Sequence, residues 1–109
     1  MKISELNKLV RDEIVPQLTK KGIQCEWQEL TDPEMAKALD NKLQEEVQEF
    51  LQADERNKLD EIVDIIAVLI ERAKRLGYTV EQLDDAVITK AMLKGGFAKN
   101  IFLKRTIEN

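Results

Sequence analysis

The sequence predicts an all-α fold, an antiparallel bundle of three long helices with a short N-terminal helix. Three observations support this. Apolar residues recur at helical spacing over 35–51, the run 62–70 is apolar at every position but Asp64, and helix start and stop signals separate the segments. At 109 residues the chain is expected to form a single domain, residues 1–109.

The N-terminal third predicts one short helix and the start of a long one. Pro16 suits the first turn of a helix over about 15–21, which Gly22 ends. The long helix begins at residues 31–34, where either Asp32 caps with Pro33 in the first turn, or Thr31 and Glu34 form a capping box. It is expected to run to about residue 53.

Two further helices follow. Asn57 is expected to cap the second long helix, which runs to Leu76 and stops at Gly77. Thr79 and Gln82 resemble a capping box opening a third helix over 80–94. Alternation over 24–30 and the apolar residues 101–103 suggest short strands that could pair, a minor two-stranded β element.

The apolar run 62–70 is too wide for one partner helix in so short a chain. We therefore expect oligomerisation to complete the core, in a homodimer or higher homo-oligomer.

Composition excludes several classes of function. The net charge of -4 without a basic stripe argues against nucleic-acid binding. With no histidine, a Ser-His-Asp triad and histidine-ligated zinc are impossible. The single Cys25 fits a reducing compartment, and no apolar segment is long enough for a signal or membrane helix, so a cytoplasmic protein without membrane contact is expected.

Acidic residues occur in two pairs with helical spacing. Glu46 and Glu49 form one pair, and Glu61 and Asp64 form the other. Glu46 falls inside the apolar stripe of its helix, and Glu49 lies at the edge of that stripe. Glu45 lies further around the helix, on the side expected to face solvent. Asp64 interrupts the apolar run of the next helix. Because clustered acids in apolar surroundings repel one another unless a cation joins them, the pattern predicts a magnesium site, with Mn²⁺ as a substitute.

Four cations stand out at two places in the chain: Lys8 and Arg11 near the start, and Lys90 and Lys94 on helix 80–94. Lys90 and Lys94 fall on the apolar side of helix 80–94 and are expected to face inward. The alternative is that both are lysines whose stems cover apolar surface while their ammonium groups reach water.

These motifs together resemble a known superfamily. Glu-Glu-x-x-Glu at 45–49, Glu-x-x-Asp at 61–64, Asn7-Lys8-Leu9-Val10-Arg11-Asp12, and Lys94-Gly95-Gly96-Phe97 before Ile101-Phe102-Leu103 are similar to the MazG-like all-α nucleoside triphosphate pyrophosphohydrolases. They fit the small, single-domain house-cleaning or phosphoribosyl-ATP pyrophosphohydrolase-like branch.

The resemblance implies a hydrolase that cleaves nucleoside triphosphates between the α and β phosphates, with Glu46, Glu49, Glu61 and Asp64 as magnesium ligands and Glu45 as a weaker candidate. For such a substrate, the candidates for neutralising the phosphates and the pyrophosphate leaving group are Lys8, Arg11, Lys90 and Lys94. Glu45 or Glu49 is the candidate proton acceptor, because no histidine is present. Two alternatives remain: the phosphoribosyl-ATP pyrophosphohydrolase of histidine biosynthesis, and a non-catalytic, metal-binding helical dimerisation module. Trp27, Phe50 and Phe97 are candidates for stacking on a base, or core residues.

Overall fold

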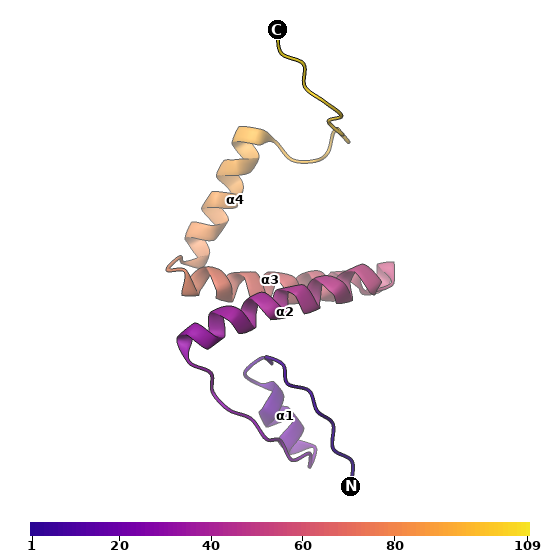
Figure 1. Cartoon of the computed structure of the whole chain (residues 1–109), viewed down its shortest axis with the longest axis vertical. Coiled ribbons are helices and arrows are strands. Elements are labelled where there is room, and N and C mark those ends of the chain that lie inside the picture. Colours follow the sequence, from indigo (N-terminus) through magenta and orange to yellow (C-terminus); the bar gives the residue numbers. More distant parts are fainter.

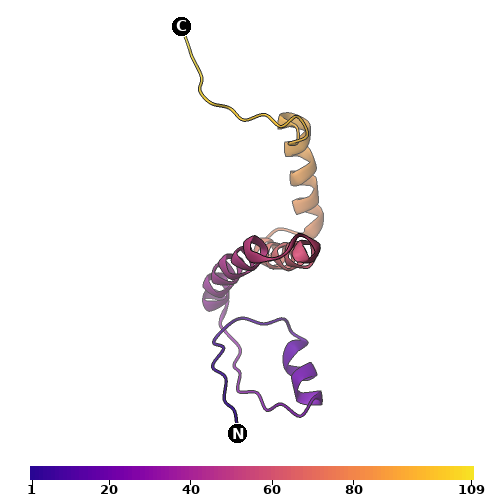
Figure 2. The ribbon, with the colours of Figure 1, turned by 90° about the vertical axis from the view of Figure 1, so that its right-hand side faces the viewer.

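The computed structural model describes residues 1–109 and is all-helical, with no strand (Figure 1). Its elements are α1 (Ile14–Lys20), α2 (Asp32–Gln52), the 3₁₀ turn η1 (Glu55–Asn57), α3 (Lys58–Arg75) and α4 (Val80–Lys94). The all-α class and the three long helices are confirmed. The expected β element is wrong: residues 24–30 and 101–103 lie on opposite sides of α2 and α3, so neither has a neighbouring strand to bond (Figures 1 and 2).

The antiparallel pair α2–α3 forms the centre of the molecule, and the turn over 53–57 joins the two helices at one end (Figure 1). Leu39, 3% exposed, is the only buried apolar residue. The only other buried residue is Glu46, 5% exposed and on the face of α2 that meets α3. A carboxylate therefore occupies a position where most helix pairs place an apolar side chain.

Capping decides where α2 begins. The Thr31 backbone N–H donates to Glu34 Oε1 at 2.9 Å, and the Glu34 N–H donates to Thr31 Oγ1 at 3.4 Å. Of the two expected arrangements, the capping box is therefore the one formed, and the bond from the Thr31 backbone lowers the pKa of Glu34.

The start of α3 differs from the expectation. Asn57 precedes the helix, but its side chain makes no capping hydrogen bond. The turn η1 leads directly into α3, and Lys58 Nζ instead donates to the Phe50 carbonyl oxygen at 2.6 Å. This bond gives a second donor to a carbonyl in the last turn of α2, which also accepts the Ala53 N–H, and it fastens the end of one helix to the start of the next.

The end of α3 is as expected. Gly77 has a φ of +100°, its N–H donates to Lys74 O, and the Tyr78 N–H donates to Ala73 O at 3.0 Å. These two bonds close the helix in a Schellman motif that needs a left-handed residue. The expected capping box of Thr79 and Gln82 then opens α4.

Helix α4 does not pack along the α2–α3 pair. It leaves the pair at the end opposite the 53–57 turn, and residues 1–30 lie on the other side of the pair (Figures 1 and 2). It contacts α3 but not α2, and none of its residues is buried. One chain alone therefore does not form the three-helix bundle.

The chain is much more extended than a compact domain. Its radius of gyration is 18.9 Å and its extents are 69 × 34 × 24 Å, whereas a compact domain of this length has a radius near ~13 Å. The accessible surface is 10402 Å², against roughly 6,200 Å² for a folded monomer of the same mass. None of the helices has both the length and the apolar character that crossing a membrane requires.

This exposed apolar surface leads to a prediction on stability. If a second chain covers the surface, unfolding is coupled to dissociation, and dilution lowers the melting temperature. We expect a decrease of about 3–4 °C for each tenfold dilution, from the unfolding enthalpy typical of a dimer of such chains. Circular dichroism melts over a dilution series measure it. An unchanged melting temperature, with a monomer by sedimentation, would contradict the prediction.

Candidate metal centre

The predicted acids lie together near the 53–57 end of the α2–α3 pair. Oxygens of Glu45, Glu46 and Glu49 lie within 4.8 Å of one another, and so do oxygens of Glu46, Glu61 and Asp64. Glu46 belongs to both groups and connects them. We call these five residues the carboxylate cluster. Antiparallel pairing brings the two motifs together, because each lies within a few turns of the connecting turn.

Two oxygens of the cluster are buried without a partner. Glu46 Oε1 is 3.1 Å from Lys42 Nζ, but Glu46 Oε2 is buried and accepts no hydrogen bond. Glu61 Oε2, on the facing helix α3, is also buried and accepts no hydrogen bond. Leaving such oxygens unpaired is costly, and a cation held between α2 and α3 would satisfy them. The donor set of carboxylate oxygens fits a hard divalent ion.

Lys42 is a member of the site that the sequence analysis missed. Its side chain is 15% exposed, and its Nζ lies 3.2 Å from Glu45 Oε1 and 3.1 Å from Glu46 Oε1. It precedes these acids by three and four residues, the spacing of helical ion pairs, so the pattern was visible in the sequence. Lys42 therefore holds one oxygen of each carboxylate and leaves the second oxygen of Glu46 free.

One lysine between two carboxylates does not neutralise both. Burial lowers the pKa of Lys42, but its bonds to Glu46 and Glu45 outweigh burial and the pKa is raised. Burial raises the pKa of Glu46, and Glu49 raises it further, while Lys42 only partly offsets them. Two carboxylates stabilise the charged form of Lys42, whereas Glu46 shares the single positive charge of Lys42 with Glu45. The charge of Glu46 is thus incompletely compensated.

Two of the four predicted cations reach the cluster from the N-terminal segment. Arg11 Nη2 donates to Asp64 Oδ1 at 2.8 Å, and Lys8 Nζ lies 3.8 Å from Glu45 Oε1. Asp64 interrupts the apolar run 62–70, but it has a cationic partner from the N-terminal segment. Its side chain is 39% exposed and has an arginine partner.

Two further expectations need correction. Glu45 was expected toward solvent, yet it is half-buried between Lys8 and Lys42, whereas Glu49 is exposed. The expected exposure of Glu45 followed from the apolar residues of its own helix alone. Lys8 and Lys42, which cover the Glu45 side chain, were not considered. Lys90 and Lys94, expected to face inward, are exposed on α4 and form no ion pair, because α4 leaves the pair at the far end.

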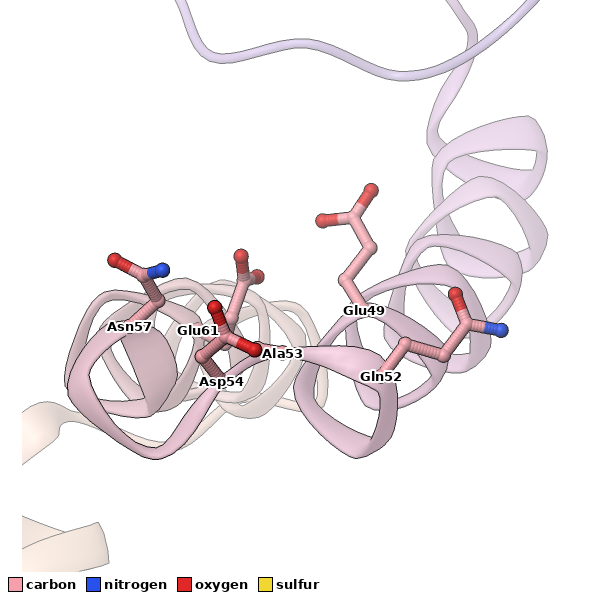
Figure 3. A pocket seen from close by; sticks show the side chains of 6 residues that line it. All are labelled: Glu49, Gln52, Ala53, Asp54, Asn57 and Glu61. Carbon is pink, nitrogen blue, oxygen red and sulfur yellow. The ribbon is translucent and has the colours of Figure 1, made fainter.

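A hollow adjoins the cluster at the turn. Its volume is about 430 Å³, and Glu49 and Glu61 contribute to its wall from α2 and α3 (Figure 3). Both side chains point out of the same side of the helix pair (Figure 3). The remaining lining residues are Gln52, Ala53, Asp54 and Asn57. The hollow is open and polar, so a ligand would reach Glu49 and Glu61 directly from solvent.

The aromatic candidates do not surround this hollow. Trp27 and Phe97 are exposed elsewhere, and Phe50 lies beneath Lys58 Nζ, 4.4 Å from the ring centroid. No protein-family model, curated protein or solved structure matches the chain.

The state of Glu46 leads to a prediction on stability without metal. Because its pKa is raised in the folded protein, ionised Glu46 destabilises the fold as pH rises above the ordinary value of 4.5. We expect Glu46→Gln to raise the melting temperature at pH 7 in a chelating buffer, and the difference to shrink as pH falls toward 4. Glu55→Gln, at an exposed position outside every ion pair, is the control. A lower melting temperature for Glu46→Gln at pH 7 would show that its pairing with Lys42 outweighs burial.

Proposed function

We propose that this protein is a Mg²⁺-dependent nucleoside triphosphate pyrophosphohydrolase, cleaving between the α and β phosphates to release nucleoside monophosphate and pyrophosphate in the house-cleaning of non-standard nucleotides. The observation that carries the proposal is buried Glu46, which has an unpaired oxygen, Oε2, and which lies in one group with Glu61 and Asp64. A scaffold helix pair gains nothing from an unpaired buried carboxylate, whereas a metal site requires free oxygens.

Glu46, Glu49, Glu61 and Asp64 are the residues that would hold the metal. Glu46 and Asp64 belong to one group with Glu61, and Glu49 lies beside Glu46 on the same helix. All four offer carboxylate oxygens, the ligands that magnesium prefers, and Mn²⁺ accepts the same set. When bound, the ion supplies Lewis-acid activation of a phosphoryl oxygen and of water.

The charges of the chain explain why a cation is needed before a triphosphate can bind. Five carboxylates of the cluster face three cations, Lys8, Arg11 and Lys42. The excess of negative charge repels a triphosphate, and added divalent charge reverses the local field. Binding of substrate is therefore expected to depend strictly on the divalent ion.

Four residues of the chain have candidate roles in proton transfer and phosphate binding. Glu49 is exposed at the hollow and can accept a proton from an attacking water, and Glu45 is the second candidate. Lys8 and Arg11 lie at the edge of the cluster, where they can neutralise phosphate oxygens. Arg11 can do so only after leaving Asp64, with which it is paired in this structure.

The direct test is pyrophosphate release over a panel of standard and modified nucleoside triphosphates and phosphoribosyl-ATP, with Mg²⁺, with Mn²⁺ and with a chelator. We expect metal-dependent release of pyrophosphate together with a monophosphate. Exclusive turnover of phosphoribosyl-ATP would assign the protein to histidine biosynthesis. Metal binding without turnover of any substrate would instead support the non-catalytic module.

A substitution at Asp64 tests the ligand set. Asp64→Asn keeps the shape of the side chain but removes a charged ligand, so we expect at least a ~100-fold lower rate with an unchanged helical signal. Asp60→Asn is the matched control, since Asp60 is exposed on α3 and belongs to neither acidic group. Full activity of Asp64→Asn would rule out the proposed ligand set.

A further inference from the structure

The carboxylate cluster consists of two acidic groups that share one residue. We call Glu45, Glu46 and Glu49 the α2 group, and Glu46, Glu61 and Asp64 the α2–α3 group. The α2 group contains a lysine, because Lys42 Nζ lies 3.2 Å from Glu45 Oε1 and 3.1 Å from Glu46 Oε1. In the α2–α3 group the only other cation is Arg11, whose side chain is 58% exposed. The cluster is therefore asymmetric, with a half-buried ammonium group on one side alone.

We propose that Lys42 takes the place of a second divalent ion, so that the cluster holds a single ion, at the α2–α3 group. Lys42 is then a positioning residue, which fixes Glu46 through one carboxylate oxygen and excludes an ion from the α2 group. The proposal rests on the metal centre of the proposed function, and it does not depend on the reaction or the substrate.

Unpaired oxygens mark the α2–α3 group as the side that lacks a cation. Glu46 is 5% exposed, and its Oε2 is buried without a hydrogen bond. Glu61, which belongs to the α2–α3 group alone, also has a buried and unpaired Oε2, whereas neither Glu45 nor Glu49 has such an oxygen. Because a buried carboxylate oxygen without a partner is costly, a cation stabilises the α2–α3 group more than the α2 group.

Lys42 is held more firmly than the other cations of the cluster. Its side chain is 15% exposed, against 41% for Lys8 and 58% for Arg11. It also lies on the same helix as both of its partners, so its two bonds bring no second segment of chain into place. Water can replace Lys8 and Arg11, whereas removing Lys42 would leave a second oxygen of buried Glu46 without a partner.

The ammonium group and an ion in the α2 group exclude one another. An ion bound by Glu45 and Glu46 would compete with Lys42 for the carboxylates that it already engages. Two positive charges on the same carboxylates repel strongly in a partly buried site, because little solvent screens them. The charges of the whole cluster agree, since one divalent ion supplies the two positive charges by which five carboxylates exceed three cations.

Lys42 also orients the carboxylate that the two groups share. Carboxylates that bind metals are commonly held by a further hydrogen-bond partner, which fixes their orientation. Lys42 engages Glu46 Oε1 and leaves Oε2 without a partner. Asp64 follows the same pattern, because Arg11 donates to its Oδ1 at 2.8 Å. Each of these two acids therefore has one oxygen bound to a cation of the chain and keeps a second oxygen for the metal.

Counting bound manganese tests the proposal without any substrate. Electron paramagnetic resonance separates free from bound Mn²⁺, and we expect wild type to bind one ion per chain. Lys42→Met keeps the apolar stem but removes the charge, so it should bind a second ion at least ~100-fold more tightly than wild type does. Lys42→Arg restores a cation and should bind one ion. Lys37→Met is the control, because Lys37 is exposed on the same helix and forms no ion pair.

The spectrum of the variant distinguishes this role from a structural one. Two ions in Lys42→Met would share Glu46, the residue common to both groups. Manganese ions ~4 Å apart in such a site should give the spectrum of a spin-coupled pair. Loss of a structural contact alone would change stability and produce neither a second ion nor the coupling. Lys42→Gln, which also lacks the charge, repeats the measurement if Lys42→Met shows no helical signal. Two ions in wild type, or a single ion in the folded uncharged variant, would overturn the proposal.

Failure of the proposed function gives a different result. Wild type that binds one Mn²⁺ and hydrolyses no nucleotide, with a second ion in Lys42→Met, refutes the enzyme and supports the role of Lys42. Active wild type with two ions per chain refutes the role of Lys42 and leaves the enzyme. Wild type without any bound Mn²⁺ refutes both.

Discussion

One buried carboxylate constrains the centre of the structure. Glu46 and Leu39 are the only two buried residues and lie on the same face of α2. Lys42 holds only one of the two Glu46 oxygens. The interface therefore contains a buried carboxylate oxygen without a partner. In the proposed metal site, the oxygen that weakens the helix pair would bind the divalent ion, which would couple stability to function at this residue.

The N-terminal segment contributes to this balance from outside the helix pair. Arg11 partly neutralises the charge of Asp64, and Lys8 lies near the Glu45 carboxylate. Both ion pairs are partly exposed, so each contributes little to stability. Their effect is on charge: they reduce repulsion within the cluster, and they place at its edge the two cationic side chains that the proposed function assigns to the phosphates.

The sequence predicted the helices well because their signals are local. The capping box at Thr31, the Schellman glycine at Gly77 and the box at Thr79 each involve residues within a few positions of one another. The convergence of the two acidic motifs was also predictable, since a short turn between two helices forces them to be antiparallel neighbours. The burial of Glu46 followed from its place in the apolar stripe.

Most of the wrong expectations concern contacts between residues far apart in the sequence. Asn57, which makes no capping hydrogen bond, and Glu45, which pairs with Lys42 one turn before it, are local exceptions. The Arg11–Asp64 pair spans 53 positions, and no periodicity encodes it. The strands expected at 24–30 and 101–103 were judged on local alternation, but a strand needs a neighbour that these segments lack. The spacing of apolar residues in α4 places Lys90 and Lys94 on its expected inward side, but this local spacing does not show what packs against that side. In this chain both lysines are exposed.

The measurement that tests the central claim most directly is the effect of Mg²⁺ on thermal stability, compared between wild type and Glu46→Gln. If the cluster binds the ion in the folded state alone, wild type should gain about 2.7 kcal/mol at a concentration one hundred times the dissociation constant. Glu46→Gln should gain much less at the same concentration. Equal stabilisation of both proteins, or none in wild type, would contradict a metal centre built around Glu46.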